Sequence, residues 1–563
     1  MNNLKIILSN FSKYDKKKFL IFSFLIVLLL VVELFSISLF IPLINFFFNA
    51  KVKTFEDIDF FNSLFADFSI TYMIILIIIT FTLKNIIFAF CSYFKKKILM
   101  SIQINFTNKI YEKILKKDYL YFAKSSNAEV LRNMSIVPSY VAFVENFINA
   151  LIEILILIMI ITLIYLQNKF IACALVLSGI LILLFSRVLF KERLKVYGQL
   201  YNIFQQQILN NYMNALGSIK NVLIQNKQNF FLKDLKLNLI KQGNSVVKGG
   251  FINELPRAVV ELYFIVFVSA IVLYLKGIYN DNAELLANIS FLVILTFKAM
   301  PSISKIIYQL NGIYYKIDII NKTHSIINNE SIHKDSGKIV HTNKFDEIQK
   351  IQLKNITFGY TEDNPMIFKD FDLLIEKNQT IGIYGSSGSG KSTLVDILAG
   401  LIKPKNGNLI VNDYDLDNLN LIKNYQKYIS YISQKNYILN SSIKNNIAFG
   451  EDEKKIDLQK VNEVIKMAKI KEIVDAKKQN IDFNVGDDGK NLSAGQRQRL
   501  IIARALYINS QIIIMDEATS NLDKKNELEI MKDIKLNFHH KRILIIISHD
   551  MNILDFCDKI IKI

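Results

Sequence analysis

The second half of the chain is organised around the stretch IGIYGSSGSGKST, which runs from Ile381 to Thr393. A short apolar run leads into the spacing GxxxxGKS, and LVDILAG, which is typical of a helix, follows it. In such a loop the glycines let the backbone curl so that its N–H groups face a phosphate. The stretch therefore predicts a strand, a phosphate-binding loop and a helix, and with them a nucleotide site in an α/β domain.

The side chains of this loop have predicted roles in binding ATP and Mg²⁺. Lys391 can reach the β- and γ-phosphates, and the hydroxyl of Ser392 can bind the metal ion. Because the loop surrounds the phosphates, we predict that these of its residues contact ATP: Gly385, Ser386, Gly388, Ser389, Gly390, Lys391, Ser392 and Thr393.

A second motif, IIIMDEATSNLD, spans Ile512 to Asp523. Its apolar start predicts a buried parallel strand, and Asp516 at the end of that strand would hold Mg²⁺ with its water shell. Glu517 would polarise the attacking water, since phosphoryl transfer depends mainly on positioning and charge neutralisation. Alone, Asp516 and Glu517 would be interpreted as an acidic pair that caps a helix, but the phosphate loop favours catalysis.

The first half of the chain is far more apolar. Of the 563 residues 51% are hydrophobic, the mean hydropathy is +0.27, and the apolar residues gather before about Leu310. A membrane span needs about 20 apolar residues, and six runs qualify: 19–48, 70–94, 143–166, 169–190, 255–276 and 284–308. The first run is far longer than the ~7–15 apolar residues of a signal peptide, and no small-residue cleavage site follows it. We interpret it as a retained span.

Charge predicts how the spans are oriented. The formal net charge is +18; such a balance can indicate nucleic-acid binding, but lysine-rich gaps between spans explain it here. The gaps 95–142 and 191–254 are basic, whereas the gap 49–69 carries four acidic residues against two lysines. Because cytoplasmic loops hold the excess of Lys and Arg, both termini are predicted inside. The cysteines show no metal or disulfide spacing: Cys91, Cys173 and Cys557.

The external gap 49–69 has apolar residues at the spacing of one helix face: Phe61, Leu64, Phe65 and Phe68. One interpretation is a short helix that packs on its own domain. The other is a helix that lies at the membrane surface. The sequence leaves both open.

Composition changes after about residue 325, where polar residues and short β-branched runs take over. We therefore predict a transmembrane domain at 1–324, a linker at 325–347 and an ATPase domain at 348–563. The predicted fold class is multidomain: an all-α domain of six transmembrane helices, followed by an α/β P-loop nucleotide-binding domain.

The stretch LSAGQRQRL, Leu492 to Leu500, lies between the two nucleotide motifs. It resembles the signature LSGGQ of ABC transporters, and over essentially its whole length the chain is similar to a half-transporter of the exporter type (type IV). Ala494 replaces the first signature glycine, and its methyl group would slow closure on the nucleotide. Family members also continue with a hairpin and a helix beyond a strand such as IIKI, at which this sequence stops with Ile563.

The resemblance assigns further residues to the ATP site. It implies that Tyr360 in FGY stacks on adenine, that Gln434 in YISQ joins Mg²⁺ to the membrane domain, and that His549 in IISHD contacts the γ-phosphate. Catalysis would then rest on Glu517, His549 and Gln434, and Mg²⁺ on Ser392, Gln434 and Asp516. Signature and loop residues would complete the ATP contacts: Ser493, Gly495, Gln496 and Asp523.

The resemblance also implies the partner and the location. Family members work as dimers, in which the phosphate loop of one subunit meets the signature of the other. This chain has one of each and retains Glu517 and His549, so a homodimer with two competent sites is implied; a heterodimer would more often show one degenerate set. The location implied is the bacterial inner membrane, with the ATPase domain in the cytoplasm and no nucleic-acid partner.

Charged residues within the spans indicate the substrate. Four cations lie there or at a span edge: Lys84, Arg257, Lys298 and Lys305. Acidic residues supply the opposite charge: Glu33, Glu145, Glu153 and Glu261. One alternative is pairing, above all of Arg257 with Glu261, and lysines that reach the membrane interface. Because intramembrane charge usually faces a cavity or a path, we predict that the four cations line a cavity for an anionic amphiphile.

The membrane domain further resembles PglK-type lipid-linked-oligosaccharide flippases. The resemblance rests on VELFSISLFIPLI at Val32 to Ile44, on Pro256-Arg257 with Glu261, and on Lys298 and Lys305 around Met-Pro-Ser. It implies ATP-driven flipping of a polyprenyl-diphosphate glycan for surface glycosylation. The alternative is export of a peptide, a drug or another lipid by the same ATPase. A soluble P-loop regulator of nucleic acid is a third hypothesis, against which six spans argue.

Overall fold

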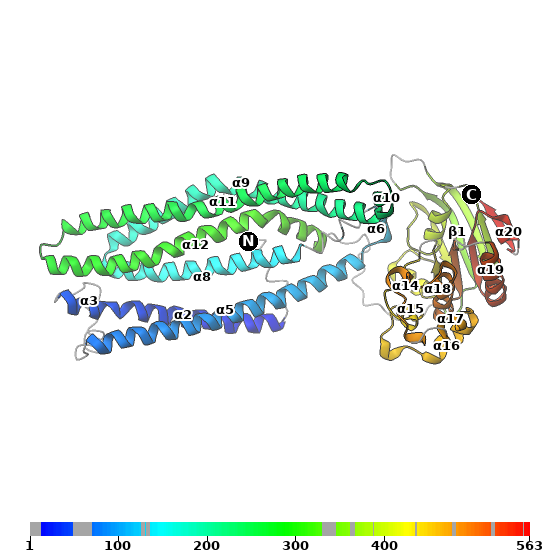
Figure 1. Ribbon diagram of the computed structural model, residues 1–563, viewed down its shortest axis with the longest axis horizontal. Helices are drawn as coiled ribbons and strands as arrows, with labels where there is room; N and C mark the ends of the chain where they lie inside the picture. The colour runs from blue at the N-terminus through cyan, green and yellow to red at the C-terminus, as the bar shows by residue number, and fades with distance from the viewer. Residues whose placement is uncertain are drawn as a thin grey trace. The chain divides into compact units, whose positions relative to one another are not determined.

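The structure is a computed structural model, and it describes most of the chain. The described residues are 13–48, 70–124, 130, 136–328, 345–360, 366–386, 388–433, 436–475, 480–518, 524–555 and 557–563. The chain divides into two compact units (Figure 1). The first comprises Met1–Lys117 with Lys124–Asn329, and the second comprises Asp118–Ala123 with Glu330–Ile563.

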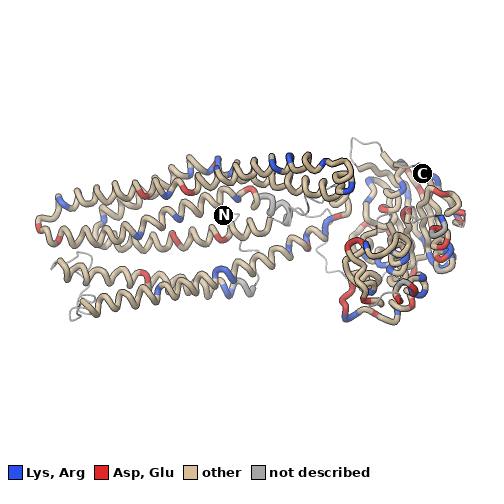
Figure 2. The backbone as a smooth tube through the Cα atoms, viewed as in Figure 1, with Lys and Arg blue, Asp and Glu red and all other residues tan. Residues whose placement is uncertain are grey.

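The first unit is built from long helices. Within the described residues, six helical segments are long and apolar enough to cross a membrane, which confirms the predicted number of spans. Figure 2 shows that charged residues interrupt these helices only at intervals. The helices are α2 (Lys13–Ser38), α3 (Phe40–Phe48), α5 (Ile70–Leu115), α8 (Val137–Gln167), α9 (Lys169–Gly217), α11 (Gln228–Lys276) and α12 (Asn282–Asn328), with the short α10 (Ile219–Ile224).

The helices extend well beyond the apolar runs of the sequence. Helices α9 and α11 have 49 residues each, more than twice the about 20 that a bilayer needs. They continue through most of the basic gap 191–254, where water can surround the polar residues. The fifth helix therefore does not begin near 255: Pro256 lies inside α11 and Pro301 inside α12.

Proline explains the break in the first span. Helix α2 ends at Ser38 and α3 begins at Phe40, so Leu39 separates them. Pro42 follows Ser38 by four residues, and a proline ring clashes with the carbonyl four residues earlier and cannot donate a hydrogen bond to it. The break is thus encoded locally, within the predicted first span.

Two apolar clusters hold the first unit together. One joins α8, α9, α11 and α12 with α3, and includes Ile160, Val260 and Phe291. The other joins α2, α5 and α8, where Phe106 stacks on Tyr140 with ring centroids 4.1 Å apart. The outward side chains are apolar as well, as expected beside lipid; Val188 is 81% exposed.

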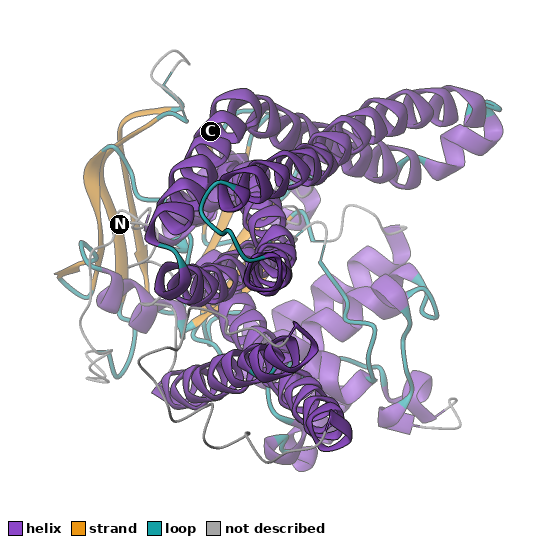
Figure 3. Ribbon diagram, turned by 90° about the vertical axis from the view of Figure 1, so that its left-hand side faces the viewer, coloured by secondary structure: helices purple, strands orange, loops and turns teal. Residues whose placement is uncertain are grey.

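The second unit contains two sheets, whose strands are orange in Figure 3. The antiparallel sheet has the order β2-β1-β4-β5, with β1 (Lys350–Phe358), β2 (Phe368–Glu376), β4 (Asn406–Val411) and β5 (Tyr414–Asp415). The parallel sheet has the order β6-β7-β8-β3-β9, with β3 (Thr380–Tyr384), β6 (Ile429–Ile432), β7 (Ile512–Asp516), β8 (Ile543–Ile547) and β9 (Lys559–Lys562). Strands β7 and β8 are buried along nearly their whole length, which explains their continuous apolar sequences.

The second unit also contains α-helices. They are α13 (Lys391–Leu398), α14 (Leu419–Gln426), α15 (Ile443–Ile447), α16 (Leu458–Met467), α17 (Lys471–Asp475), α18 (Ala494–Ile508), α19 (Lys524–Phe538) and α20 (Met551–Leu554). The second unit also includes most of α6 (Tyr119–Lys124), which comes from the predicted gap 95–142. There Leu120 packs against an apolar cluster that contains Ile381 and Leu394. The multidomain fold class is confirmed.

Candidate active site

The parallel sheet brings the predicted catalytic residues together. The phosphate loop follows β3, Asp516 and Glu517 lie at the end of β7, and His549 follows β8. Strand β8 pairs with both β3 and β7, all in parallel. Because parallel strands end at the same edge of a sheet, residues that are far apart in the sequence meet there.

Lys391 occupies the centre of the phosphate loop. Its side chain is buried, and its Nζ donates hydrogen bonds to the carbonyl oxygens of Gly385 and Ser386, each at 2.9 Å. Gly390 has φ 103°, in the left-handed region, and a Cβ there would lie 2.5 Å from a methyl carbon of Ile367. The loop therefore requires glycine at 390, and it holds an ammonium group at its centre.

Ser389 tests whether this loop fits a phosphate. Its hydroxyl oxygen is buried and has no hydrogen-bond partner in the described structure. Such a group is costly unless a ligand or water satisfies it. Together with the Lys391 ammonium and the N-terminus of α13, which favours an anion, the unpaired hydroxyl fits the phosphates of ATP.

A carboxylate cluster lies beside the loop and fits Mg²⁺. The hydroxyls of Tyr431 and Ser392 both hydrogen-bond to Asp516, the first at 3.0 Å. Burial raises the pKa of the Asp516 carboxyl, with Glu517 adding to the increase. Burial, with the Asp516 charge, also raises the pKa of Asp396 to about 6. A dication bound by Asp516 and Ser392 would offset this accumulation of negative charge.

Glu517 and His549 contact each other directly. His549 Nε2 lies 2.7 Å from Glu517 Oε1 and 3.5 Å from Lys391 Nζ. Glu517 adopts φ 48°, a left-handed conformation that is uncommon for residues other than glycine. This backbone turn places the carboxylate directly after β7, beside the phosphate loop. The two predicted catalytic side chains are thus neighbours.

The predicted adenine contact also lies near the loop. The Tyr360 hydroxyl is 3.1 Å from Thr393 Oγ1, and its ring packs edge-on against Phe358 with centroids 5.2 Å apart. The side chain is partly exposed, so a ring face can stack on a base.

Sequence reasoning missed three residues of this site. Tyr431 and Asp396 surround Asp516, as described above. The third is Tyr119 on α6. Burial raises the pKa of the Tyr119 hydroxyl, and the charges of Asp396 and Tyr360 add to the increase. No motif marks these positions, although Tyr431 lies in the quoted YISQ and Asp396 in LVDILAG.

The signature residues form the start of helix α18. Ser493 is its N-cap: its hydroxyl accepts from the Gln496 backbone N–H at 3.3 Å, and the Gln496 side-chain oxygen accepts from the Ser493 N–H at 3.0 Å. The capping box fixes the start of a 15-residue helix, in which Gly495 is the second residue. The N-terminus of such a helix favours an anion. Ala494 is the first residue of that helix and is exposed.

Replacing Ala494 with Gly is expected to leave ATPase activity equal or to raise it. Because the alanine is exposed at the helix start, its removal creates no cavity and gives an approaching nucleotide more room. Steady-state ATPase assays of the two purified proteins measure the effect. A large loss of activity in Ala494→Gly would show instead that the methyl group is a needed packing feature.

Several predicted residues lie outside the described residues. They are Gln434 and Asp523 of the ATP site, and Phe61, Leu64, Phe65 and Phe68 of the external gap. Their assignments stay predictions.

Contacts in the first unit join two of the four predicted substrate cations. Lys298 donates a hydrogen bond to Glu33 Oε1, and Lys84 Nζ lies 3.5 Å from the same oxygen. Glu33 is buried, only 7% exposed, and the three residues link α2, α5 and α12. Two ammonium groups thus share one carboxylate.

The other two cations have separate environments. Lys305 forms an ion pair with Glu153 at 2.8 Å. Arg257 is exposed on α11, and among the described residues it makes no ion pair with Glu261, which is also exposed. The alternative in which Arg257 pairs with Glu261 is therefore not seen among the described residues. An exposed pair four residues apart gains only about 0.3–0.5 kcal/mol, which is too little to hold two long side chains together.

Comparisons with known proteins identify the second unit. Residues 368–520 match the family model "ABC transporter". A probable ABC transporter ATP-binding/permease protein of Haemophilus influenzae is 36% identical over 217 residues, which cover 38% of each chain. An ATP-dependent lipid A-core flippase of Ralstonia nicotianae is 32% identical over 229 residues, 40% of this chain and 38% of the relative. The chain thus spans about two fifths of the length of these curated relatives.

The fold of the whole chain also has a solved counterpart. A bacterial Atm1-family ABC exporter with ATP bound superposes with a TM-score of 0.82 and 16% sequence identity, covering 97% of this chain and 93% of the exporter. At this identity the likeness shows the fold alone. The chain has six apolar helical segments followed by a domain that matches the ABC transporter family model, in the fold of an exporter-type ABC transporter.

Proposed function

We propose that the protein uses ATP to flip an amphiphile with an anionic head across the bacterial inner membrane. The proposed substrate is a polyprenyl-diphosphate-linked oligosaccharide for surface glycosylation. The observation that carries this substrate class is the buried Glu33 with its two lysines, Lys84 and Lys298. The ATP-driven part of the proposal is supported by the fold and by the assembled ATP site described above.

The charges of this cluster do not cancel. Glu33 supplies one negative charge against two ammonium groups, so one positive charge remains within apolar helices. Burying an unbalanced charge is costly, and intramembrane charges commonly mark substrate paths. A diphosphate would offset this excess and could also be met by Lys305 and Arg257, which are more exposed.

The proposed functional unit is a homodimer that binds ATP and Mg²⁺. Lys391, Asp516, Glu517 and His549 lie at one edge of the parallel sheet, whereas the signature lies on α18, a different element. A second copy could place its α18 N-terminus on the phosphates held by Lys391. The dimer would then contain two composite sites, each made of the phosphate loop of one subunit and the signature of the other.

The main alternative is the export of a peptide, a drug or another lipid. The relative from Ralstonia nicotianae is named for a lipid substrate, whereas another relative, from Lactococcus lactis, is named for the transport of lacticin, so the relatives do not decide between the two kinds of cargo. The partly buried lysines favour an anionic head but do not distinguish a diphosphate lipid from other anionic cargo by geometry alone.

A flipping assay tests the proposal. Purified protein in proteoliposomes is given a fluorescent polyprenyl-diphosphate saccharide, and access to a membrane-impermeant quencher reports its movement. We expect ATP-dependent flipping that excess unlabelled diphosphate lipid suppresses and that peptides or neutral drugs do not. ATP-dependent transport of a peptide panel, with no movement of the diphosphate lipid, would replace the proposed substrate with the alternative.

A further inference from the structure

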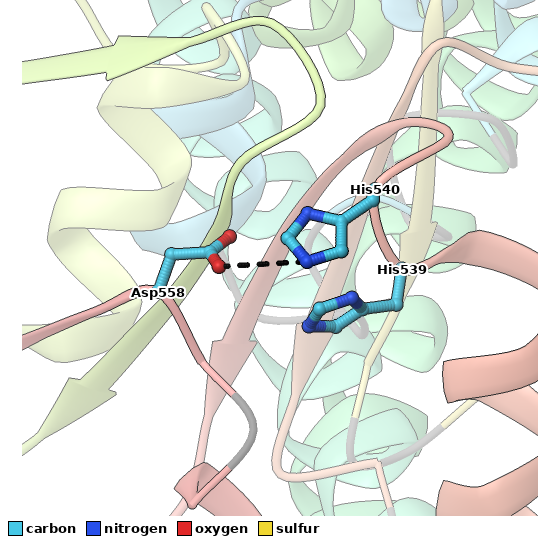
Figure 4. Close-up of side chains that lie close together, drawn as sticks. All are labelled: His539, His540 and Asp558. Atoms are coloured by element: carbon cyan, nitrogen blue, oxygen red, sulfur yellow. Dashed lines mark ion pairs between the residues drawn. The ribbon is translucent and has the colours of Figure 1, made fainter.

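A second cluster of ligating side chains lies away from the ATP site, on the same unit. His539 and His540 occupy the turn between α19 and β8, and Asp558 comes directly before β9. One ligand atom from each residue lies within 4.8 Å of the other two (Figure 4). Among the described residues, this is the group of His, Cys, Asp and Glu with the geometry of a metal site.

The backbone turns both histidines towards the same carboxylate. Neighbouring side chains on an extended strand point to opposite faces, but His540 has φ 55°, in the left-handed region. The two imidazole rings therefore lie with centroids 3.8 Å apart, and Figure 4 shows both on the side that faces Asp558. Two adjacent histidines can thus act as a pair of ligands.

A backbone hydrogen bond orients the carboxylate. Asp558 Oδ2 accepts from the N–H of Thr380, the first residue of β3, at 2.7 Å. Its other oxygen, Oδ1, lies 3.9 Å from His540 Nε2. Such a partner behind a ligand is typical of metal sites, because it fixes the ligand's direction and leaves one oxygen for the ion.

We propose that His539, His540 and Asp558 form a surface site for a transition-metal dication of the Zn²⁺ class. Two imidazoles with one carboxylate suit Zn²⁺, Ni²⁺ or Cu²⁺, whereas Mg²⁺ and Ca²⁺ prefer oxygen ligands. The His540 side chain is 66% exposed, so an ion can enter and water can complete the coordination. The site is distinct from the Mg²⁺ site because it lies where β8, β3 and β9 begin, and the ATP residues lie where the strands end.

The bound metal would fasten the edge of the parallel sheet. Strand β9 is terminal in the described sheet and pairs with β3. The metal would tie the residue before β9 to the turn before β8, across the start of β3. Because a ligand that binds only the folded state stabilises it, Zn²⁺ should protect the ATPase unit against heating without taking part in hydrolysis.

Metal binding is tested on the full-length protein in detergent, purified without a histidine tag and stripped with a chelator. Zn²⁺ is titrated in competition with a chromogenic chelator, for the wild type, His539→Ala, His540→Ala and Asp555→Asn. Asp555 is an exposed carboxylate three residues before Asp558 and outside the cluster, so it is the matched control. Wild type and Asp555→Asn are expected to bind one Zn²⁺ per chain with equal affinity.

Each histidine variant should bind Zn²⁺ at least roughly 10- to 100-fold more weakly than the wild type. The loss of a partner that only orients a ligand already has an effect of this size, and a histidine is itself a ligand. Cu²⁺ electron paramagnetic resonance should show nitrogen couplings in the wild type that decrease in either variant. Asp558→Asn, which keeps an oxygen for the Thr380 N–H, should also weaken binding. Equal Zn²⁺ affinity in the wild type and both histidine variants would overturn the site, and so would a Cu²⁺ spectrum without nitrogen ligands.

Discussion

Replacing Glu517 with Gln is expected to leave ATP binding intact and to reduce hydrolysis by about 100- to 10,000-fold, the usual contribution of a positioned general base. The carboxylate lies 2.7 Å from His549 Nε2, beside the phosphate loop. Gln keeps the size and an oxygen that can still accept from His549. It loses the negative charge that polarises water, so the chemical step fails while the site stays assembled.

A comparison with Lys391→Ala separates chemistry from binding. Lys391 lies at the centre of the loop, 2.9 Å from two carbonyl oxygens, where it would meet the phosphates. Its loss should weaken nucleotide binding itself, whereas Glu517→Gln should not. Glu472→Gln, an exposed carboxylate on α17, is the matched control and should behave as the wild type.

Two measurements are needed on each purified protein: phosphate release, and binding of a fluorescent ATP analogue. The assignment predicts normal binding with failed hydrolysis for Glu517→Gln, and impaired binding for Lys391→Ala. Wild-type turnover in Glu517→Gln would remove Glu517 from the catalytic role. Turnover lost together with binding in Glu517→Gln would point to a structural role instead.

The sequence could predict this site because its parts follow from local patterns. A glycine-rich loop between strand and helix, and an acidic pair at the end of an apolar strand, are readable without a structure. The parallel sheet then brings Lys391, Asp516 and His549 to one edge, where their strands end. The signature was recognised differently, by its resemblance to a family motif, and the structure shows Ser493 and Gln496 as a capping box at the start of α18.

Residues that depend on packing could not be predicted in this way. Tyr431 meets Asp516 at 3.0 Å because β6 pairs with β7, a register that no short motif contains. Tyr119 comes from a gap between spans and joins the second unit through α6. Helix length could not be predicted from the spans, because apolar runs mark the part of a helix within lipid, and α9 and α11 continue through polar sequence.

Neutralising Lys298 is expected to reduce flipping by about 10- to 100-fold, since a hydrogen bond to a charged group contributes roughly 1.5–3 kcal/mol. Lys298 and Lys84 share Glu33, so the cluster carries a net charge of +1. Lys298→Ala leaves one lysine on one glutamate, and the charge that would meet a diphosphate disappears. ATP hydrolysis measured without substrate should persist, because the ATP site belongs to the other unit.

Arg257 provides a second arm of the same test. It is exposed and has no ion pair with Glu261 among the described residues, so its planar guanidinium is available for bidentate phosphate contact. Arg257→Ala should reduce flipping strongly, whereas Arg257→Lys should be partly tolerated. Neutralising Lys298 and Lys305 together should be worse than either change alone.

Charge compensation distinguishes a substrate role from a structural one. Glu33→Gln leaves two lysines without their carboxylate, so the net charge of the cluster becomes +2 and folding should suffer from two unpaired, partly buried charges. The double variant, Glu33→Gln with Lys298→Ala, restores a net charge of +1 with a single ammonium group.

If the positive charge binds the diphosphate, the double variant should flip the substrate faster than Lys298→Ala alone. If the cluster only holds α2, α5 and α12 together, losing two of its three members should be worse than losing one. Flipping rates of monodisperse proteins decide between these outcomes, and wild-type flipping after neutralising all four cations would remove the cavity altogether.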